Sequence, residues 1–165
     1  HISINLAPAD LTSGILPPLL SQLLNKWQIH PRQIALELTE RGFADPKISA
    51  PAIAAFRRSG HPVYIDDFGT GYSSLTLLNQ LPFNTIKIDK SFVDQIGTHI
   101  NEDRLIASII QMIHSLNKKV IAEGVETERQ LLCLKRKRCD YIQGYVYSKP
   151  LTEQEAMAFL EARQE

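Results

Sequence analysis

The chain has 165 residues, a length that suits one domain, and its 44% apolar and 22% charged content is ordinary for a globular protein. Its 18 basic and 18 acidic residues give a formal net charge of zero, so composition shows no sign of a nucleic-acid or membrane surface. No apolar run is long enough to span a bilayer, and Cys133 and Cys139 match no zinc spacing. We therefore expect a cytoplasmic domain with reduced core thiols, either free or as the cytoplasmic part of a membrane-anchored protein.

The first two elements follow from short-range patterns. Residues 2–6 alternate apolar and polar side chains, which predicts a strand. Pro17 and Pro18 suit the first turn of a helix that runs to about Trp27. The apolar residues expected on the buried face of this helix are Leu19, Leu20, Leu23, Leu24 and Trp27.

The rest of the chain repeats the same order of strand and helix. Capping residues mark several helices: Asn101 is a candidate cap, and Thr127 and Thr152 open capping boxes. Strict alternation of this kind predicts one parallel sheet with helices outside it. The six strands are expected near residues 2–6, 34–38, 62–66, 84–88, 119–123 and 141–144.

The stretch from residue 63 to residue 75 is the centre of the expected site. An apolar strand ends there in two adjacent carboxylates, Asp66 and Asp67, and a buried charge must be paired or bind metal. Because side chains alternate along a strand, we expect these two to point to different sides. Gly69 and Gly71 would let the following loop turn back over the site. The alternative is an Asp-rich turn that only caps the next helix.

Every expected strand ends in a polar residue able to bind a metal or move a proton. In a barrel of parallel strands, active sites assemble at this carboxyl-terminal rim. The rim set is Asn5, Glu37, Asp66 with Asp67, Lys87 with Asp89, Glu123, and Gln143. The structural alternatives are a turn cap for Asn5, an ion pair for Glu37, an ion pair between Lys87 and Asp89, accepted backbone hydrogen bonds for Glu123 and a core amide for Gln143.

The rim set favours metal-dependent phosphoryl chemistry. Oxygen donors without His or Cys suit Mg²⁺ or Mn²⁺, and so many carboxylates suit two ions that clamp a phosphoryl displacement. Lys87 would then orient the attacking water or neutralise charge in the transition state. The chain has no Ser-His-Asp arrangement and no phosphate-binding glycine loop, and Asp67-Phe68-Gly69 lacks the partners of a kinase motif.

The residues resemble the EAL-type phosphodiesterases, which hydrolyse the bacterial messenger cyclic di-GMP to linear pGpG. The matching pieces occur in the family's order and extend over nearly the whole chain. The resemblance implies a modified (β/α)₈ barrel of the TIM type. The matching segments are residues 4–6, 36–40, 65–75, 86–89, 122–127, 142–145 and 148–151.

The resemblance also implies roles for single residues. Asn5, Glu37 and Asp66 would hold one metal, and Asp66 would bridge to a second metal held by Asp67 and Glu123. The catalytic set would be Asp66 and Asp67 with Lys87 and Gln143, the last two contacting the nucleophilic water or its ligands. Support of the rim would come from Glu40, which tethers the loop containing Gly69 and Gly71, and from Asp89 and Glu126; a plain structural role for Glu126 is an equal alternative. This loop and the helix after it would carry dimer contacts to the site.

The sequence departs from the family at its start. The Glu-Ala-Leu segment that names the family belongs on an earlier strand, together with an arginine for the substrate phosphate, and neither is present. A complete barrel runs to about 250 residues. We therefore expect residues 1–165 to be a single partial barrel domain with six of eight strand–helix units, preceded by a sensor domain. The 165 residues alone should be inactive and should form a homodimer or an edge-paired oligomer, because the outer strands leave unpaired edges.

Two other functions remain open at this point. A barrel of this kind can serve as a non-catalytic receptor for cyclic di-GMP or for a partner protein. An unrelated barrel lyase that uses Lys87 as a base is the second alternative, and the order of the motifs argues against it.

Overall fold

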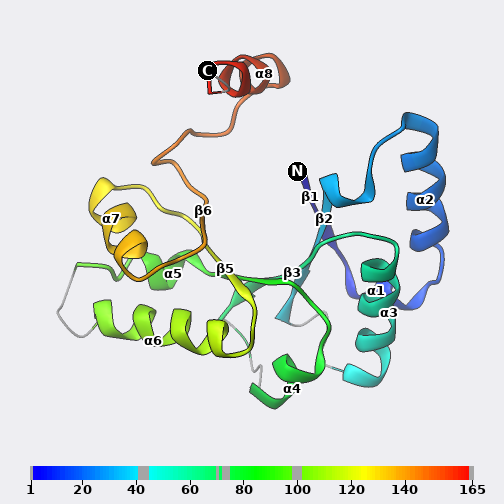
Figure 1. Cartoon of the computed structure of the whole chain (residues 1–165), viewed down its shortest axis with the longest axis horizontal. Helices are drawn as coiled ribbons and strands as arrows, with labels where there is room; N and C mark the ends of the chain where they lie inside the picture. Colours follow the sequence, from blue (N-terminus) through cyan, green and yellow to red (C-terminus); the bar gives the residue numbers. More distant parts are fainter. Residues whose placement is uncertain (1, 41–44, 70, 72–74, 98–101, 164–165) are drawn as a thin grey trace.

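The computed structural model describes residues 2–40, 45–69, 71, 75–97 and 102–163. Six strands form one parallel sheet in which every strand pairs with its neighbours in sequence (Figure 1). This confirms the predicted alternating α/β architecture, because adjacent parallel strands require a crossover connection between them. The strands are β1 (Ile2–Leu6), β2 (Ile34–Thr39), β3 (Val63–Phe68), β4 (Thr85–Ile88), β5 (Lys119–Ala122) and β6 (Tyr141–Ile142).

The helices lie around the sheet, and a long loop joins β6 to α8 (Figure 1). Phe159 of α8 lines a hollow together with Tyr64 and Ile121 of the sheet. None of the described helices combines the length and the apolar character that crossing a membrane requires. The short elements α1, η1 and α5 were not predicted, because three to five residues are too few to show a helical period. The helices are α1 (Pro8–Thr12), α2 (Leu16–Trp27), η1 (Pro31–Gln33), α3 (Pro46–Arg58), α4 (Leu75–Gln80), α5 (Lys90–Val93), α6 (Glu102–Ser115), α7 (Glu128–Arg136) and α8 (Glu153–Glu161).

The two faces of the sheet have different chemistry. Leu36, Ile65 and Ile86 are fully buried in the main core that the strands share with the helices. The residues that alternate with them point to the other face, where Ala35 and Tyr64 belong to a second, smaller apolar cluster. The same alternation places Asn5, Glu37, Asp66 and Lys87 on this second face, beyond the small cluster.

Strand β3 continues further than predicted and changes geometry at its end. The prediction stopped it at Asp66, whereas the strand reaches Phe68, and its pairing with β4 shifts register between Ile65 and Phe68. Asp67 has a left-handed backbone with φ of 54°. A left-handed residue breaks the alternation of side chains, so Asp67 need not face away from Asp66.

The predicted apolar face of α2 is only partly buried. Leu20 and Leu24 pack inside, but Leu19 and Leu23 are more than two-fifths exposed and Trp27 is 66% exposed. The apolar stripe of this helix is therefore wider than the surface that the described elements offer to it.

The two outer strands of the sheet, β1 and β6, carry apolar side chains that are exposed to solvent. Ile2 and Ile4 of β1 are 69% and 40% exposed, and Tyr141 of β6 is 46% exposed. Within the described part of the chain, no ladder joins β1 to β6. Exposed strands of this kind are templates for pairing with another chain.

Asp140 ties the entrance of β5 to the end of α6. Its Oδ2 accepts a hydrogen bond from the Val120 backbone N–H at 2.9 Å and from His114 Nε2 at 2.8 Å. Partial burial raises the pKa of Asp140, but these two hydrogen bonds outweigh burial and hold the pKa below its usual value. Because the folded state lowers this pKa, the stabilisation is present above the unfolded pKa of about 4 and is lost as the pH falls through the folded pKa.

Asp140→Asn should therefore lower the free energy of unfolding by about 1–2 kcal/mol at neutral pH, since a charged acceptor of two hydrogen bonds is lost. The difference from the unmodified protein should shrink as the pH falls below about 4. Urea unfolding across this range measures the effect, with the exposed Glu161→Gln as the control. A loss of the same size at neutral and at acid pH would show that the charge of Asp140 plays no part.

Candidate active site

Lys87 is the centre of a buried charge cluster at the carboxyl ends of four neighbouring strands. Its Nζ lies 2.8 Å from Glu37 Oε2, 3.0 Å from Asp66 Oδ1 and 2.8 Å from Glu123 Oε1. The Lys87 side chain is only 4% exposed. Glu37, Asp66 and Lys87 come from β2, β3 and β4, and Glu123 directly follows β5. The structure thus brings these four predicted rim residues together.

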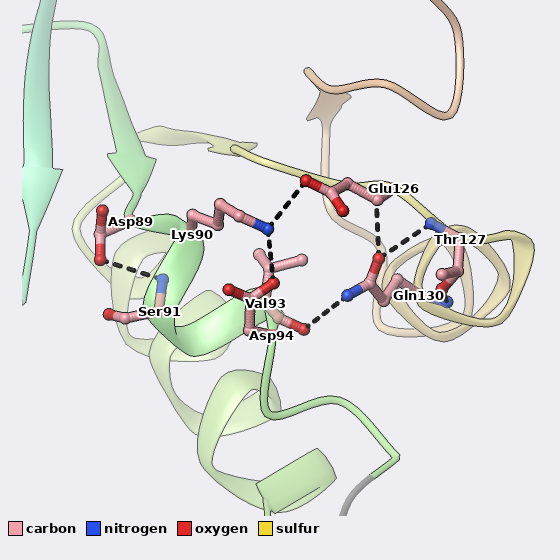
Figure 2. Close-up of polar contacts among 8 residues, drawn as sticks. All are labelled: Asp89, Lys90, Ser91, Val93, Asp94, Glu126, Thr127 and Gln130. Carbon is pink, nitrogen blue, oxygen red and sulfur yellow. Dashed lines mark hydrogen bonds and ion pairs between the residues drawn. The ribbon is translucent and has the colours of Figure 1, made fainter.

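The alternative pairing of Lys87 with Asp89 is wrong. Asp89 is the N-cap of α5, and its Oδ1 accepts a hydrogen bond from the Ser91 backbone N–H at 3.0 Å (Figure 2). Lys87 and Asp89 are two residues apart, but the chain leaves the strand after Ile88. The strand period that predicted a shared face therefore no longer applies at Asp89.

The cluster holds more negative charge than one ammonium group balances. Burial lowers the pKa of Lys87, but hydrogen bonds to Glu123 and Glu37 outweigh it and hold the pKa above its usual value. Burial, together with the charge of Asp66, raises the pKa of Glu123 to about 7 in spite of the neighbouring Lys87. Burial and the charge of Asp66 also raise the pKa of Asp67. A further positive charge beside these carboxylates would favour their ionised forms and lower both pKa values.

The geometry of three carboxylates fits a divalent cation. One oxygen each of Asp66, Asp67 and Glu123 lies within 4.8 Å of the other two. Asp66 and Asp67, which were expected to point to different sides, therefore have carboxylate oxygens close enough to share an ion, and the left-handed backbone of Asp67 ends the alternation on which that expectation rested. A donor set of carboxylate oxygens suits Mg²⁺ or Mn²⁺.

Asn5 and Gln143 lie at the two ends of this row. Asn5 is the register partner of Glu37 on β1, so the two residues end neighbouring strands side by side. Gln143 directly follows β6, and its backbone N–H donates to the Ala122 carbonyl at 2.9 Å. Its side chain lines a hollow of about 450 Å³ together with Glu123. This volume lies in the range of about 300–1,000 Å³ that is usual for small-molecule sites.

Glu40, for which the resemblance implied a tether to the loop after β3, lies beside the start of that loop. Gly69, with φ of 102°, has its backbone N–H 3.5 Å from Glu40 Oε1. Gly71 packs so closely on the Glu40 carboxylate that any side chain at position 71 would overlap it. Residues 70 and 72–74 of this loop, and the predicted cap Asn101, lie outside the described residues.

A polar network that the sequence did not predict braces the loop carrying Glu123. Lys90 Nζ contacts Glu126 Oε1 at 3.0 Å and Asp94 Oδ1 at 2.7 Å (Figure 2). Gln130 Oε1 accepts from the Glu126 and Thr127 backbone N–H groups at 2.9 and 3.0 Å. Gln130 Nε2 donates to the Val93 carbonyl at 3.2 Å, which ties the loop to α5. The sequence signals for this network were the predicted capping box at Thr127 and the rim-support role that the resemblance implied for Glu126.

Gly144 locks together the loops that carry Glu123 and Gln143. The Val125 backbone N–H donates to the Gln143 carbonyl at 3.1 Å, and the Val146 N–H donates to the Val125 carbonyl at 2.9 Å. A side chain at position 144 would overlap the backbone of Val125, and Gly144 has φ of 156°. Backbone cannot move aside as a flexible side chain does, so only glycine fits here.

Gly144→Ala should destabilise the protein by about 2–4 kcal/mol, because the two loops must separate and one backbone bond at least is lost. Mn²⁺ affinity should fall with it, since Glu123 moves. Gly14→Ala is the matched control, because Gly14 has φ of 66° and open space around it. Urea unfolding and metal titration measure both effects, and equal losses in the two variants would contradict the role of the close contact.

The comparison with known proteins identifies the family. A family model described as the EAL domain matches residues 1–150. The chain belongs to the EAL domain family. Over 161 residues this EAL domain is 48% identical to the "Probable cyclic di-GMP phosphodiesterase PdeB" of Escherichia coli, with 98% of the chain but 30% of the relative covered. It is 34% identical to the "Cyclic di-GMP phosphodiesterase RocR" of Pseudomonas aeruginosa, with 93% of the chain and 40% of the relative covered.

Solved structures agree with this assignment. The EAL domain superposes on the PaMucR phosphodiesterase in complex with c-di-GMP with a TM-score of 0.87 at 31% identity, over 94% of this chain and 64% of that one. It superposes on Klebsiella pneumoniae BlrP1 in a manganese and cyclic di-GMP complex with a TM-score of 0.81 at 30% identity, over 91% of this chain and 39% of that one. The chain therefore spans less than two thirds of each of these proteins.

Proposed function

We propose that the domain containing this chain hydrolyses cyclic di-GMP to linear pGpG in bacterial second-messenger signalling. The observation that carries the proposal is the buried cluster of Glu37, Asp66 and Glu123 around Lys87, with Asp67 beside it. A purely structural ion pair needs one carboxylate for one ammonium group. Here the carboxylates are in excess and crowd at the rim where barrel enzymes place their chemistry.

We propose that the site takes two divalent ions, Mg²⁺ or Mn²⁺. Asn5, Glu37 and Asp66 would hold one, and Asp66, Asp67 and Glu123 the other. The register pairing of Asn5 with Glu37 and the short distances among the three acidic oxygens support this division. Such ions, when bound, activate water and neutralise phosphoryl oxygens.

We assign Lys87 an electrostatic role. Its contacts with Glu37 and Glu123 favour the charged form, so it carries a fixed positive charge toward the developing negative charge of the transition state. The same contacts argue against the lyase alternative, because a base must be deprotonated near neutral pH. Gln143 would orient water through its amide, beside Glu123.

The remaining predicted residues would keep the rim in place. Glu40 would hold the loop at Gly69 and Gly71, as their close contacts support. Asp89 would start α5, and Glu126 would join Lys90 to the loop after β5. These contacts favour the structural role for Glu126.

The deciding experiment uses the intact protein with cyclic di-GMP and Mn²⁺ or Mg²⁺, and separates pGpG from substrate by chromatography. We expect metal-dependent production of pGpG, abolished by chelation and unchanged in Glu161→Gln, an exposed residue far along the chain. Saturable binding of cyclic di-GMP without pGpG at any metal concentration would instead establish the receptor alternative. Residues 1–165 alone should be inactive, because the family's Glu-Ala-Leu strand is not among them.

We propose further that residues 1–165 form a single partial barrel domain of a larger, cytoplasmic signalling protein with an upstream sensor domain. The family match to residues 1–150 and the greater length of the relatives support this. The exposed apolar residues of β1 and β6 favour a homodimer or an edge-paired oligomer. Sedimentation of the intact protein and of residues 1–165 measures both states.

A further inference from the structure

A second hollow, of about 390 Å³, lies at the edge of the sheet opposite the carboxylate cluster. It is lined by residues that precede the strands or connect to them, namely Arg32, Arg57, Gly60, His61, Pro62 and Asn84. Because the strands are parallel, their amino-terminal ends meet at this edge. The lining contains two arginines and no acidic residue.

The positive charge around this hollow has no acidic partner among the described residues. Among the described residues, neither Arg32 nor Arg57 forms an ion pair. The Arg57 guanidinium donates one long hydrogen bond, at 3.3 Å, to the Pro82 carbonyl. Lys118 does not line the hollow, but its Nζ donates to the carbonyl of Phe83, the residue before Asn84, at 2.8 Å. Burial, and to a smaller extent the charge of Arg57, lower the pKa of Lys118, as expected for two cations near each other. An anion at this place would relieve the repulsion between the two cations.

Fixed polar groups complete the floor of the hollow. Asn84 Oδ1 accepts from the Val63 backbone N–H at 3.0 Å, so its amide nitrogen is left to donate elsewhere. His61 is 4% exposed, and its Nδ1 lies 3.0 Å from the Ile34 carbonyl. A carbonyl only accepts, so Nδ1 carries the proton and the ring orientation is set. Asn84 and His61 are therefore each held at a strand entrance by one hydrogen bond to the backbone.

We propose that this hollow binds a phosphate-class oxyanion, as the phosphate group of a phosphorylated small molecule or as inorganic phosphate. Guanidinium groups bind phosphate oxygens in pairs of parallel hydrogen bonds, and the Asn84 amide supplies a neutral donor. The volume lies in the range of about 300–1,000 Å³ typical of small-molecule sites, so an organic portion fits beside the phosphate. This site is separate from the proposed catalytic rim and does not depend on the proposed hydrolysis.

The test titrates the intact, chelator-treated protein with inorganic phosphate, glycerol phosphate or sulfate, against chloride at equal ionic strength. Without divalent ions the catalytic cluster is acidic and repels these anions, so calorimetry and the rise in melting temperature report on the hollow. We expect saturable binding of phosphate. Arg57→Gln and Arg32→Gln should each weaken it about 10- to 100-fold, the value of a charged hydrogen bond. Arg58→Gln is the matched control, since Arg58 neighbours Arg57 but does not line the hollow.

The comparison of ligands identifies the source of the phosphate. Tighter binding of glycerol phosphate would assign the hollow to a phosphorylated metabolite, and equal or tighter binding of inorganic phosphate would assign it to the free ion. Weak, non-saturating binding that Arg57→Gln and Arg58→Gln reduce alike would overturn the proposal, because it would reflect general screening. Unchanged circular dichroism of the variants without ligand shows that the fold is kept.

Discussion

Asp66→Asn is expected to abolish metal-dependent hydrolysis of cyclic di-GMP by the intact protein. Asp66 lies between the two halves of the proposed metal site: its Oδ1 is 3.0 Å from Lys87 Nζ, and one of its oxygens lies within 4.8 Å of oxygens from both Asp67 and Glu123. Asparagine has the same size but no charge. The substitution therefore removes the carboxylate that both ions would share, so neither ion is held in place.

The fold should survive this substitution, which makes the result interpretable. Asp66 Oδ1 accepts the Asp67 backbone N–H at 3.0 Å, and the asparagine carbonyl oxygen can accept the same bond. Mn²⁺ titration by calorimetry should show loss of binding, and urea unfolding should change little. Glu161→Gln serves as the control for the loss of one acidic charge. A loss of turnover no larger than about 100-fold, which is typical when a residue that only supports a metal ligand is changed, would exclude Asp66 as a shared ligand.

The rim could be predicted from the sequence because each of its parts is a local signal. Strand alternation and the order of strand and helix placed Glu37, Asp66 and Lys87 at the same edge before any contact was known. The carboxyl ends of parallel strands lie at the same edge of a sheet. Local patterns therefore predicted that residues far apart in the sequence come close together in space. The resemblance to the EAL family added the roles, which alternation alone does not supply.

The partners of Lys87 could not be predicted in the same way. Its three carboxylates come from β2, β3 and the loop after β5, and the nearest acid in sequence, Asp89, is occupied as a helix cap. The left-handed backbone of Asp67 gave no signal beyond the tolerance of aspartate for that conformation. Local rules fail at Lys87 because its partners come from other strands, and at Asp67 because its backbone departs from the strand geometry on which alternation depends.

Lys87→Met is expected to lower the stability of the metal-free protein and to increase the stabilisation that divalent ions provide. In the metal-free protein it leaves Glu37, Asp66 and Glu123 buried without a cation, which should cost about 3–5 kcal/mol of the free energy of unfolding. Divalent ions should then stabilise the variant more than the unmodified protein, because they provide the charge that the lysine supplied. Thermal unfolding with and without Mn²⁺ measures this difference.

Activity should not return with stability. If Lys87 supplies charge to the transition state, kcat of the metal-saturated variant should remain about 10²–10³-fold low while KM changes much less. The double variant Lys87→Met with Glu37→Gln separates the two roles, since removing both partners of a buried pair costs less stability than removing one. It should be more stable than Lys87→Met and remain inactive. Full turnover of Lys87→Met at saturating Mn²⁺ would mean that the lysine only balances charge, and that the metal site alone carries the reaction.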